Sequence, residues 1–255
     1  HRFFGKSVAV FDAVDSLLLK TLQLSLLPRV YAQLSGRIYH VKSRGGAKAA
    51  VFDVAQALPS FKYVFRSDIK NFYDSLDHVQ LIKACRQFDI PYSALRLIKN
   101  SLPRVEEIGS TYRSIDVVIA RGSPLSPLLG AIGLHALDHV MESLPNTYYA
   151  RYMDDWVVLC KTRTQLRSIV KYTHAIMRSL TLSLHPDKTY IGKIASGFDF
   201  LGYQLSDDQL TIHPNTVNNH RMQLQQRYAQ GASEADLADY IQRFTRWCRA
   251  GVDSS

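Results

Sequence analysis

The chain has 255 residues, of which 46% are hydrophobic, and this is enough apolar material for a folded protein with a sizeable core. Lysine and arginine outnumber aspartate and glutamate by 31 to 22, so the formal net charge is +9 and the sequence pI is near 9.5, which favours a polyanionic partner such as nucleic acid. The three cysteines are scattered singly, which excludes a disulfide scaffold and a paired-cysteine zinc site and indicates a reducing, cytoplasmic location.

The first apolar stretch, residues 7–27, predicts a buried amphipathic helix that ends at Pro28. Asp12, Asp15 and Lys20 interrupt the stretch, so it lacks the unbroken apolar run of a membrane span. It also lacks the basic start and the small-residue cleavage site of a signal peptide. We therefore expect no membrane association.

The middle of the chain mixes helical and β-type patterns. In chain order these predict a basic connection at 37–48, a helix at 49–58, a strand at 62–69, a helix from the N-cap Asp77 to Phe88 that Pro91 closes, and a helix at 126–144. Residues 148–152 and 156–160 then form two β-type runs with a tight polar turn between them, which predicts a hairpin.

The last third continues the mixture. Residues 165–180 place apolar side chains on one helical face, and short strands are expected around 182–184, 190–192, 198–205 and 210–213. From Pro214 the pattern becomes helical and polar, with Gly231 between two segments. The sequence therefore predicts an α+β class in which helices pack on a sheet.

Adjacent aspartates, Asp154 and Asp155, lie at the tip of the predicted hairpin. Two neighbouring carboxylates repel unless a cation lies between them, although a solvated turn is the commoner use of this dipeptide alone. Asp68 ends the predicted strand at 62–69 and is a third carboxylate that the intervening helices can return beside the hairpin. Because hard divalent ions prefer oxygen ligands, this set predicts a site for two Mg²⁺ ions and phosphoryl transfer.

From Tyr39 to His213 the chain resembles the reverse transcriptase family, with five motif blocks in the family's order. The pattern is similar to bacterial members of the group II intron-like lineage, with diversity-generating and antiviral defence enzymes as near relatives. The resemblance implies an α+β polymerase right hand with fingers and a ferredoxin-like palm, followed by a small helical thumb. The implied domains are fingers at 1–61, a palm at 62–213 with inserted fingers elements around 89–120, and a thumb at 214–255 that the chain contains only in part.

The segment from Arg66 to Asp77 resembles the family's first catalytic block. The resemblance makes Asp68 a ligand of both metals and places Ile69 and Tyr73 at the nucleotide. A tyrosine ring packed under C2′ of the sugar leaves no room for a hydroxyl, which favours dNTP over NTP. Plain core packing of Tyr73 is the alternative interpretation.

The run Tyr152-Met153-Asp154-Asp155 resembles the family's YMDD block. By this resemblance Asp154 binds metal directly, Asp155 assists, and Tyr152 and Met153 lie near the primer terminus. Lys188, in a segment similar to the fourth block, is implied as a catalytic residue that protonates or neutralises the departing pyrophosphate.

The segment from Arg121 to Leu129 resembles the block that contacts nucleotide and template. The resemblance implies that Gly122 lets backbone approach the new base pair and that Ser126 and Pro127 start a helix beneath the template. The family commonly has glutamine where Arg121 stands, so the hydrogen bond usually assigned to that amide is not expected here. In our interpretation Arg121 contacts phosphate instead.

Two further segments are implied in holding primer and template. Phe200, Leu201 and Gly202 belong to a segment that resembles the primer grip, for which an ordinary hairpin edge is the alternative. Arg243 and Arg246 recur on one face of the last predicted helix. The basic connection at 37–48 stands where the family's fingers contact the incoming triphosphate. This position suggests Arg44 and Lys48 as nucleotide-binding residues, although a solvated loop explains them equally well.

The resemblance implies an RNA-directed DNA polymerase, a nucleotidyltransferase in which a primer 3′-hydroxyl attacks the α-phosphate of a dNTP. Its cofactor would be two Mg²⁺ ions, for which Mn²⁺ can substitute. Its partners would be an RNA template, a DNA or RNA primer and dNTPs, with an associated non-coding RNA or an accessory protein as a further candidate. The rival interpretations are an RNA-dependent RNA polymerase and a non-catalytic, maturase-like RNA-binding scaffold.

Overall fold

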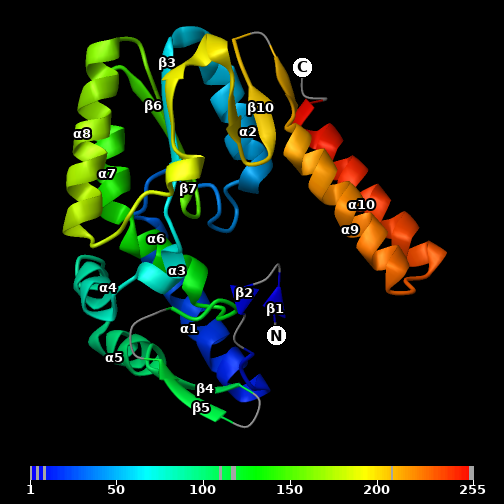
Figure 1. The fold of residues 1–255 in the computed structure, drawn as a ribbon. Coiled ribbons are helices and arrows are strands. Elements are labelled where there is room, and N and C mark those ends of the chain that lie inside the picture. Colours follow the sequence, from blue (N-terminus) through cyan, green and yellow to red (C-terminus); the bar gives the residue numbers. More distant parts are fainter. Residues whose placement is uncertain are drawn as a thin grey trace.

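A computed structural model describes residues 2–3, 6–7, 10–108, 111–115, 119–207 and 209–252 (Figure 1). Its centre is a four-stranded antiparallel sheet in the order β6-β7-β3-β8. The strands are β3 (Tyr63–Asp68), β6 (Thr147–Tyr152), β7 (Asp155–Cys160) and β8 (Tyr190–Lys193). This chain order and pairing is a split βαβ arrangement of the ferredoxin-like kind, so the predicted α+β class and ferredoxin-like palm are confirmed.

Helices and a small sheet cover the two faces of the central sheet. Helices α7 (His135–Ser143) and α8 (Arg163–Ser179) contact one face, and α2 (Gly46–Ala57) contacts β6 from the other side. Alternate residues of β3 enter different cores: Phe65 packs into the larger cluster with α8, and Val64 into the cluster with α2. Both strand faces are thus buried, which explains the apolar runs Tyr63–Phe65 in β3 and Trp156–Cys160 in β7.

The larger core continues into a mainly helical region below the sheet in Figure 1. It contains α1 (Ala13–Tyr31), α3 (Phe72–Ser75), α4 (His78–Cys85), α5 (Tyr92–Ser101) and α6 (Ser126–Gly133), together with the paired strands β4 (Arg104–Ile108) and β5 (Thr111–Ile115). A further short pair, β1 (Arg2–Phe3) and β2 (Lys6–Ser7), lies near the start of the chain. Asp77 caps α4 as predicted, because its carboxylate accepts the backbone N–H of Gln80 at 2.9 Å.

The last elements form a second sheet and a projecting pair of helices. The sheet has the order β11-β10-β9, with β9 (Phe198–Phe200), β10 (Tyr203–Leu205) and β11 (Leu210–Ile212). Helices α9 (Pro214–Ala229) and α10 (Glu234–Val252) run side by side away from the sheet (Figure 1). Gly231, with φ of +80°, lies in the turn between them, as the sequence predicts.

Several predicted boundaries are wrong. The helix expected at 126–144 is two helices, α6 and α7, broken at Leu134 directly after Gly133, whose missing side chain weakens helix continuation. The first helix runs to Tyr31 and includes Pro28 in its last turns, where the ring costs one of the last backbone hydrogen bonds without ending the helix.

Two predicted strands also differ. The run at 198–205 folds as a hairpin because Leu201 and Gly202 both adopt positive φ, which suits a two-residue turn. Around 182–184 the backbone makes only an isolated bridge between Leu184 and Ile69. In the described residues, no helix is both long enough and apolar enough to cross a membrane.

Candidate active site

Asp68 and Asp155 face each other across two neighbouring strands. Asp68 is the last residue of β3, Asp155 is the first residue of β7, and the two are direct partners in the β3–β7 register. Directly opposed residues of antiparallel strands have Cα atoms about 4.5–5.5 Å apart. Met153 and Asp154 form the two-residue loop that joins β6 to β7, so Asp154 directly precedes Asp155. The fold therefore gathers the three predicted aspartates at one end of the central sheet.

The buried position of Asp155 has an electrostatic cost. Burial raises the pKa of Asp155 to about 7, and the charges of Asp68 and Asp154 add to this rise while Arg66 opposes it. One carboxylate oxygen, Oδ2, lies 3.2 Å from the Arg66 guanidinium, whereas the buried Oδ1 has no hydrogen-bond partner among the residues that the structure describes. On the neighbouring strand β3, Oδ2 of Asp68 lies 2.8 Å from Nζ of Lys188, a residue of the short helical turn Pro186–Lys188. Two cations thus balance two of the carboxylates.

A magnesium site was predicted here, and the residues fit it in chemistry. In the part of the chain that the structure describes, no group of three or more His, Cys, Asp or Glu side chains is arranged to hold a metal ion. Asp68 and Asp155 instead turn an oxygen to Lys188 and to Arg66. The donor set nevertheless consists of carboxylate oxygens, which Mg²⁺ prefers, and the unpartnered Oδ1 of Asp155 is a buried acceptor that a cation would satisfy.

Met153, which starts the loop, is held at both of its backbone polar groups. Its φ of +58° lies in the left-handed region that non-glycine residues rarely adopt. Its N–H donates to His40 Nδ1 at 3.0 Å, and its carbonyl accepts from Arg151 Nη1 at 2.7 Å. These two contacts balance the backbone strain of Met153 and fix the loop that carries Asp154.

A fully buried ion pair positions Arg151. Its Nε and Nη2 atoms each lie 2.6 Å from one oxygen of Asp138, and Tyr149 Oη donates to the same carboxylate at 2.6 Å. Neither Asp138 nor Arg151 has exposed side-chain surface. Burial alone would lower the pKa of Arg151, but Asp138 raises it, so the guanidinium stays charged. The pair links α7 to the β6–β7 hairpin that carries Asp154.

Sequence reasoning missed His40, Arg66, Asp138 and Arg151. A usable signal existed for two of them, since Arg66 and Arg151 are charges inside predicted β-type runs, whereas the burial of Asp138 in α7 is visible only in the structure. Charges at such positions need a partner. His40 gave no comparable signal, because its role depends on the approach of a loop about a hundred residues away.

The aspartate loop borders an open pocket of about 410 Å³. Its walls include five residues predicted to contact nucleotide or template: Tyr73, Arg121, Gly122, Ser126 and Pro127. The hydroxyl of Tyr73 lies 3.8 Å from Met153 Sδ, and its pKa is raised by burial and by the nearby Asp154. Arg121 forms an ion pair with Asp74. The structure therefore brings these residues together beside Asp154.

The remaining nucleotide candidates lie in other surroundings. Ile69 is buried in the core directly after Asp68. The Arg44 guanidinium donates to carbonyls at the end of α1, including Ser35 O and Tyr31 O. Lys48 Nζ donates to the carbonyl of Arg246 at 3.2 Å, which ties α2 to α10. In this structure Arg44 and Lys48 therefore stabilise packing between elements, and a nucleotide contact by either remains a prediction.

The predicted primer grip is the turn between β9 and β10. Phe200 is fully buried, and the carbonyl of Gly202 accepts hydrogen bonds from Thr216 Oγ1 at 2.9 Å and from the backbone N–H of His213 at 3.0 Å. A side chain at Gly202, where φ is +87°, would approach Thr216 Oγ1 to 3.1 Å. On α10, Arg243 pairs with Asp239 on the exposed surface. The grip turn is thus anchored to the projecting helices.

Comparison with known proteins supports the resemblance. The family model described as reverse transcriptase (RNA-dependent DNA polymerase) matches residues 13–205. Protein YkfC of Escherichia coli (strain K12) is 24% identical over 178 residues, which cover 56% of this chain and 47% of YkfC. The retrovirus-related Pol polyprotein from the type-1 retrotransposable element R2 of Nasonia vitripennis is 28% identical over 144 residues, covering 50% of this chain and 14% of the polyprotein. The chain thus spans less than half the length of these relatives.

Solved structures share the fold. Telomerase from Candida albicans, in complex with the TWJ fragment of telomeric RNA, superposes with a TM-score of 0.59 and 13% identity, covering 79% of this chain and 38% of that one. Apo telomerase from Candida tropicalis gives 0.62 and 11%, covering 78% and 41%. At such identities the likeness shows the fold alone: a right-hand polymerase architecture with fingers, a ferredoxin-like palm and a helical thumb.

Proposed function

We propose that this chain, which belongs to the reverse transcriptase family, is an RNA-directed DNA polymerase that adds dNTPs to a primer 3′-hydroxyl. The observation that carries the proposal is the pairing of Asp68 with Asp155 across β3 and β7, next to the Asp154 loop. Within this family's fold, such a cluster of acids is costly unless cations occupy it, and two-metal phosphoryl transfer needs such a cluster.

The proposed cofactor is a pair of Mg²⁺ ions, with Mn²⁺ as a substitute, and Asp68, Asp154 and Asp155 are the residues that would hold them. When bound, the ions supply charge stabilisation to the attacking and leaving oxygens. Arg66 keeps Asp155 oriented through one oxygen and leaves the other available. Lys188 lies close enough to Asp68 to neutralise negative charge at the departing pyrophosphate once it releases that carboxylate.

The pocket beside the loop is the proposed dNTP site. Its lining by Tyr73, Gly122 and Asp154 places an aromatic ring, an exposed backbone and a carboxylate around one space. The partly buried position of Tyr73 supports its proposed part in excluding the 2′-hydroxyl, because a ring held against Met153 cannot move aside easily. Arg121 is proposed to contact phosphate after exchanging its partner Asp74.

The proposed macromolecular partners are an RNA template and a DNA or RNA primer. The net charge of +9 and the exposed arginines of α10 support this assignment, since phosphate contacts supply most of the affinity for nucleic acid. The primer end is proposed to rest on the turn at Leu201 and Gly202. A group II intron-like lineage and an associated RNA or accessory protein remain part of the proposal.

The test is primer extension on an RNA template with purified protein and Mg²⁺. Asp154→Ala should abolish extension while thermal unfolding still shows a folded protein, because the contacts of Met153 with His40 and Arg151 continue to hold the loop. Asp187→Ala is the matched control, since Asp187 is an exposed carboxylate next to Lys188 and should be neutral. Full extension by Asp154→Ala would contradict the assignment.

Supplying NTPs in place of dNTPs separates the rival activity. Extension with NTPs but not dNTPs would identify an RNA polymerase. Absence of extension with either, together with retained RNA binding, would identify a binding scaffold.

A further inference from the structure

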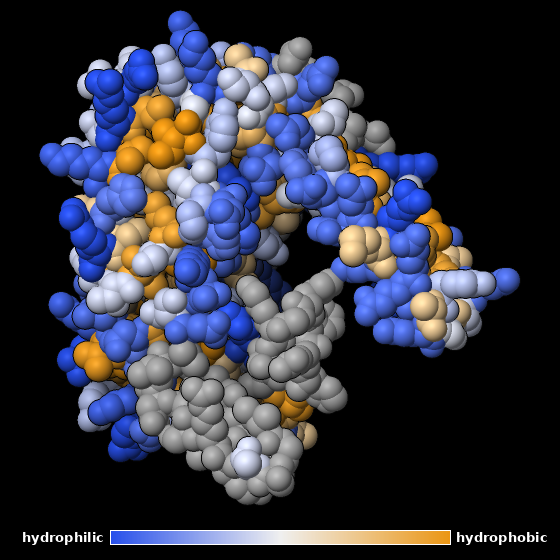
Figure 2. Space-filling model, in the orientation of Figure 1, coloured by the Kyte–Doolittle hydropathy of each residue, from blue (hydrophilic) through white to orange (hydrophobic). Residues whose placement is uncertain are grey.

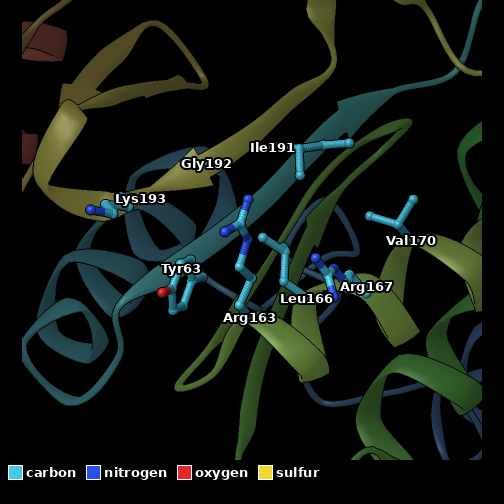
Figure 3. Close-up of a pocket in the computed structure, with 8 residues that line it drawn as sticks. All are labelled: Tyr63, Arg163, Leu166, Arg167, Val170, Ile191, Gly192 and Lys193. Carbon is cyan, nitrogen blue, oxygen red and sulfur yellow. The ribbon is translucent and has the colours of Figure 1, made fainter.

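A pocket of about 510 Å³ opens between helix α8 and strand β8, away from the aspartates (Figure 3). Its strand side begins where Tyr63 pairs with Lys193, at the opposite end of β3 from Asp68. At about 3.3 Å per residue, the pocket's wall at Tyr63 lies roughly 17 Å along β3 from Asp68, and its wall at Ile191, the partner of Phe65, lies roughly 10 Å away. The proposed polymerase site therefore does not account for it.

The pocket combines an apolar floor with a cationic rim. Leu166 and Val170 of α8 and Ile191 of β8 form the floor, and Ile191 is 48% exposed. Figure 2 shows a hydrophobic patch in the upper left of the molecule, over α8 and the neighbouring strand, with hydrophilic residues around it. Because Ile191 is continuous with Leu166 and Val170, the three residues form an apolar patch that a partner can cover.

The rim carries Arg163 and Arg167 from α8 and Lys193 from β8, and none of the described residues that line the pocket is acidic. Among the described residues, none of these three cations forms an ion pair with a carboxylate. Figure 3 shows them on both sides of the pocket. The charge of the pocket therefore complements an acidic ligand.

Strand β8 is also an open edge of the central sheet. Among the described strands it pairs with β3 alone, and the N–H of Ile194 donates to the carbonyl of Lys62 at 3.1 Å. Because hydrogen-bonded and non-hydrogen-bonded pairs alternate in an antiparallel ladder, the N–H and C=O groups of Ile191 and Lys193 point away from β3. In the described part of the chain, their one contact is the Tyr190 hydroxyl, which donates to the Lys193 carbonyl at 3.3 Å.

We propose that this pocket binds an extended acidic segment of a partner protein, which adds as a strand to the edge of β8. Main-chain hydrogen bonds to Ile191 and Lys193 would supply affinity, and alternate side chains would select the partner. Apolar side chains would cover Ile191, while carboxylates would meet Arg163 and Arg167. A nucleic acid would meet the same cations but would leave the apolar floor and the strand edge unused.

The alternative role of such an edge is protection. A lysine on a short edge strand often prevents strand addition. In β8, however, Lys193 lies at the end of the strand and the interior position is the exposed Ile191. The pocket in front of this position gives an added strand room to place its side chains.

The test measures fluorescence anisotropy, with the full chain, of a labelled synthetic peptide of repeating sequence Val-Thr-Glu-Thr, which places both Val and Glu on one face of an added strand. The wild-type protein should bind this peptide and not the version with Lys in place of Glu. Arg163→Glu/Arg167→Glu should weaken binding by about tenfold, because it reverses the rim charge. Lys83→Glu/Arg178→Glu, with the same charge change at exposed positions outside the pocket, should bind as the wild type does.

Strand addition has its own control. Lys193→Pro removes the outward N–H, and φ of −85° at this position is compatible with proline. It should weaken binding well beyond Lys193→Ala, which removes only the charge. Hydrogen exchange of the Ile191 amide should slow when peptide is added, and primer extension should not change in any of these variants, since the pocket is remote from Asp68.

Four outcomes would overturn the proposal. The first is absence of peptide binding, and the second is equal binding by Arg163→Glu/Arg167→Glu. Equal binding by Lys193→Pro and Lys193→Ala would show charge attraction without strand addition. Loss of affinity for a single-stranded RNA in Arg163→Glu/Arg167→Glu, but not in the control, would identify a nucleic-acid surface instead.

Discussion

Arg151 donates from Nη1 to the carbonyl of Met153, two residues further along the same hairpin, at 2.7 Å. The same guanidinium binds both carboxylate oxygens of Asp138. One side chain therefore connects a buried charge in α7 to the backbone of the aspartate loop. The contact with Asp138 affects the stability of the fold, and the contact with Met153 affects the geometry of the loop. Mutations at Arg151 and Asp138 can therefore separate the two effects.

Arg151→Met should lower the free energy of unfolding by about 3–5 kcal/mol, because it leaves Asp138 buried without its cation. The double variant Arg151→Met/Asp138→Asn should recover much of this loss in urea unfolding, since the uncompensated charge is gone. It should still extend primers poorly, because the Met153 carbonyl remains unheld. Wild-type extension by the double variant would show that the contact with Met153 does not matter for activity.

His40 makes stability depend on pH in the mildly acidic range. Burial, with the nearby Arg151 and Arg44 charges, lowers the pKa of His40 to about 3 from 6.5. Below pH 6.5 the unfolded chain binds a proton at His40 that the folded chain does not, so this group makes stability fall as the pH drops toward 3. The slope attributable to one such group is about 1.4 kcal/mol per pH unit.

His40→Asn tests this dependence, because its side-chain oxygen can still accept the Met153 N–H but does not titrate. Unfolding free energies of this variant and of the wild type, measured by urea titration between pH 6 and pH 4, should converge as the pH falls. Parallel curves would mean that His40 titrates normally in the folded protein. His40→Ala should in addition reduce primer extension, since it removes the acceptor.

Tyr73 is expected to control the choice of sugar. Tyr73→Ala should raise incorporation of NTPs relative to dNTPs, because it removes the ring from the pocket wall next to Met153. Tyr73→Phe should keep the wild-type preference, since the ring rather than the hydroxyl excludes the sugar oxygen. Competition assays with matched dNTP and NTP concentrations would measure the ratio, and an unchanged ratio in Tyr73→Ala would favour a core-packing role alone.

Arg246 is expected to bind phosphate from the exposed surface of α10. Arg246→Ala should weaken binding to a primer–template duplex and reduce the slope of log affinity against log salt by about 0.9, the loss of one phosphate contact. Its backbone contact with Lys48 does not involve the side chain and should persist. Arg221→Ala on α9, another exposed arginine, is the matched control, and an identical slope in both variants would contradict a specific contact by Arg246.

Local patterns in the sequence predicted much of the chemistry. Consecutive aspartates between two β-type runs predicted the hairpin with Asp154 in its loop, and Asp77 predicted the start of α4. These succeeded because turns, caps and strand alternation depend on neighbouring residues. The positive φ values at Leu201 and Gly202 show the limit of such patterns, since a continuous β-type run concealed a turn.

By itself, the sequence determined the class of the fold, the three candidate metal-binding carboxylates and the family to which the chain belongs. Only the tertiary structure decided that Asp68 pairs with Asp155, that His40 and Arg151 hold Met153, and that Arg44 and Lys48 bind backbone carbonyls. The same holds for the open edge of β8 beside α8. The physical reason is that strand register and buried charge pairs join residues far apart in the chain, so no local pattern encodes which partners meet.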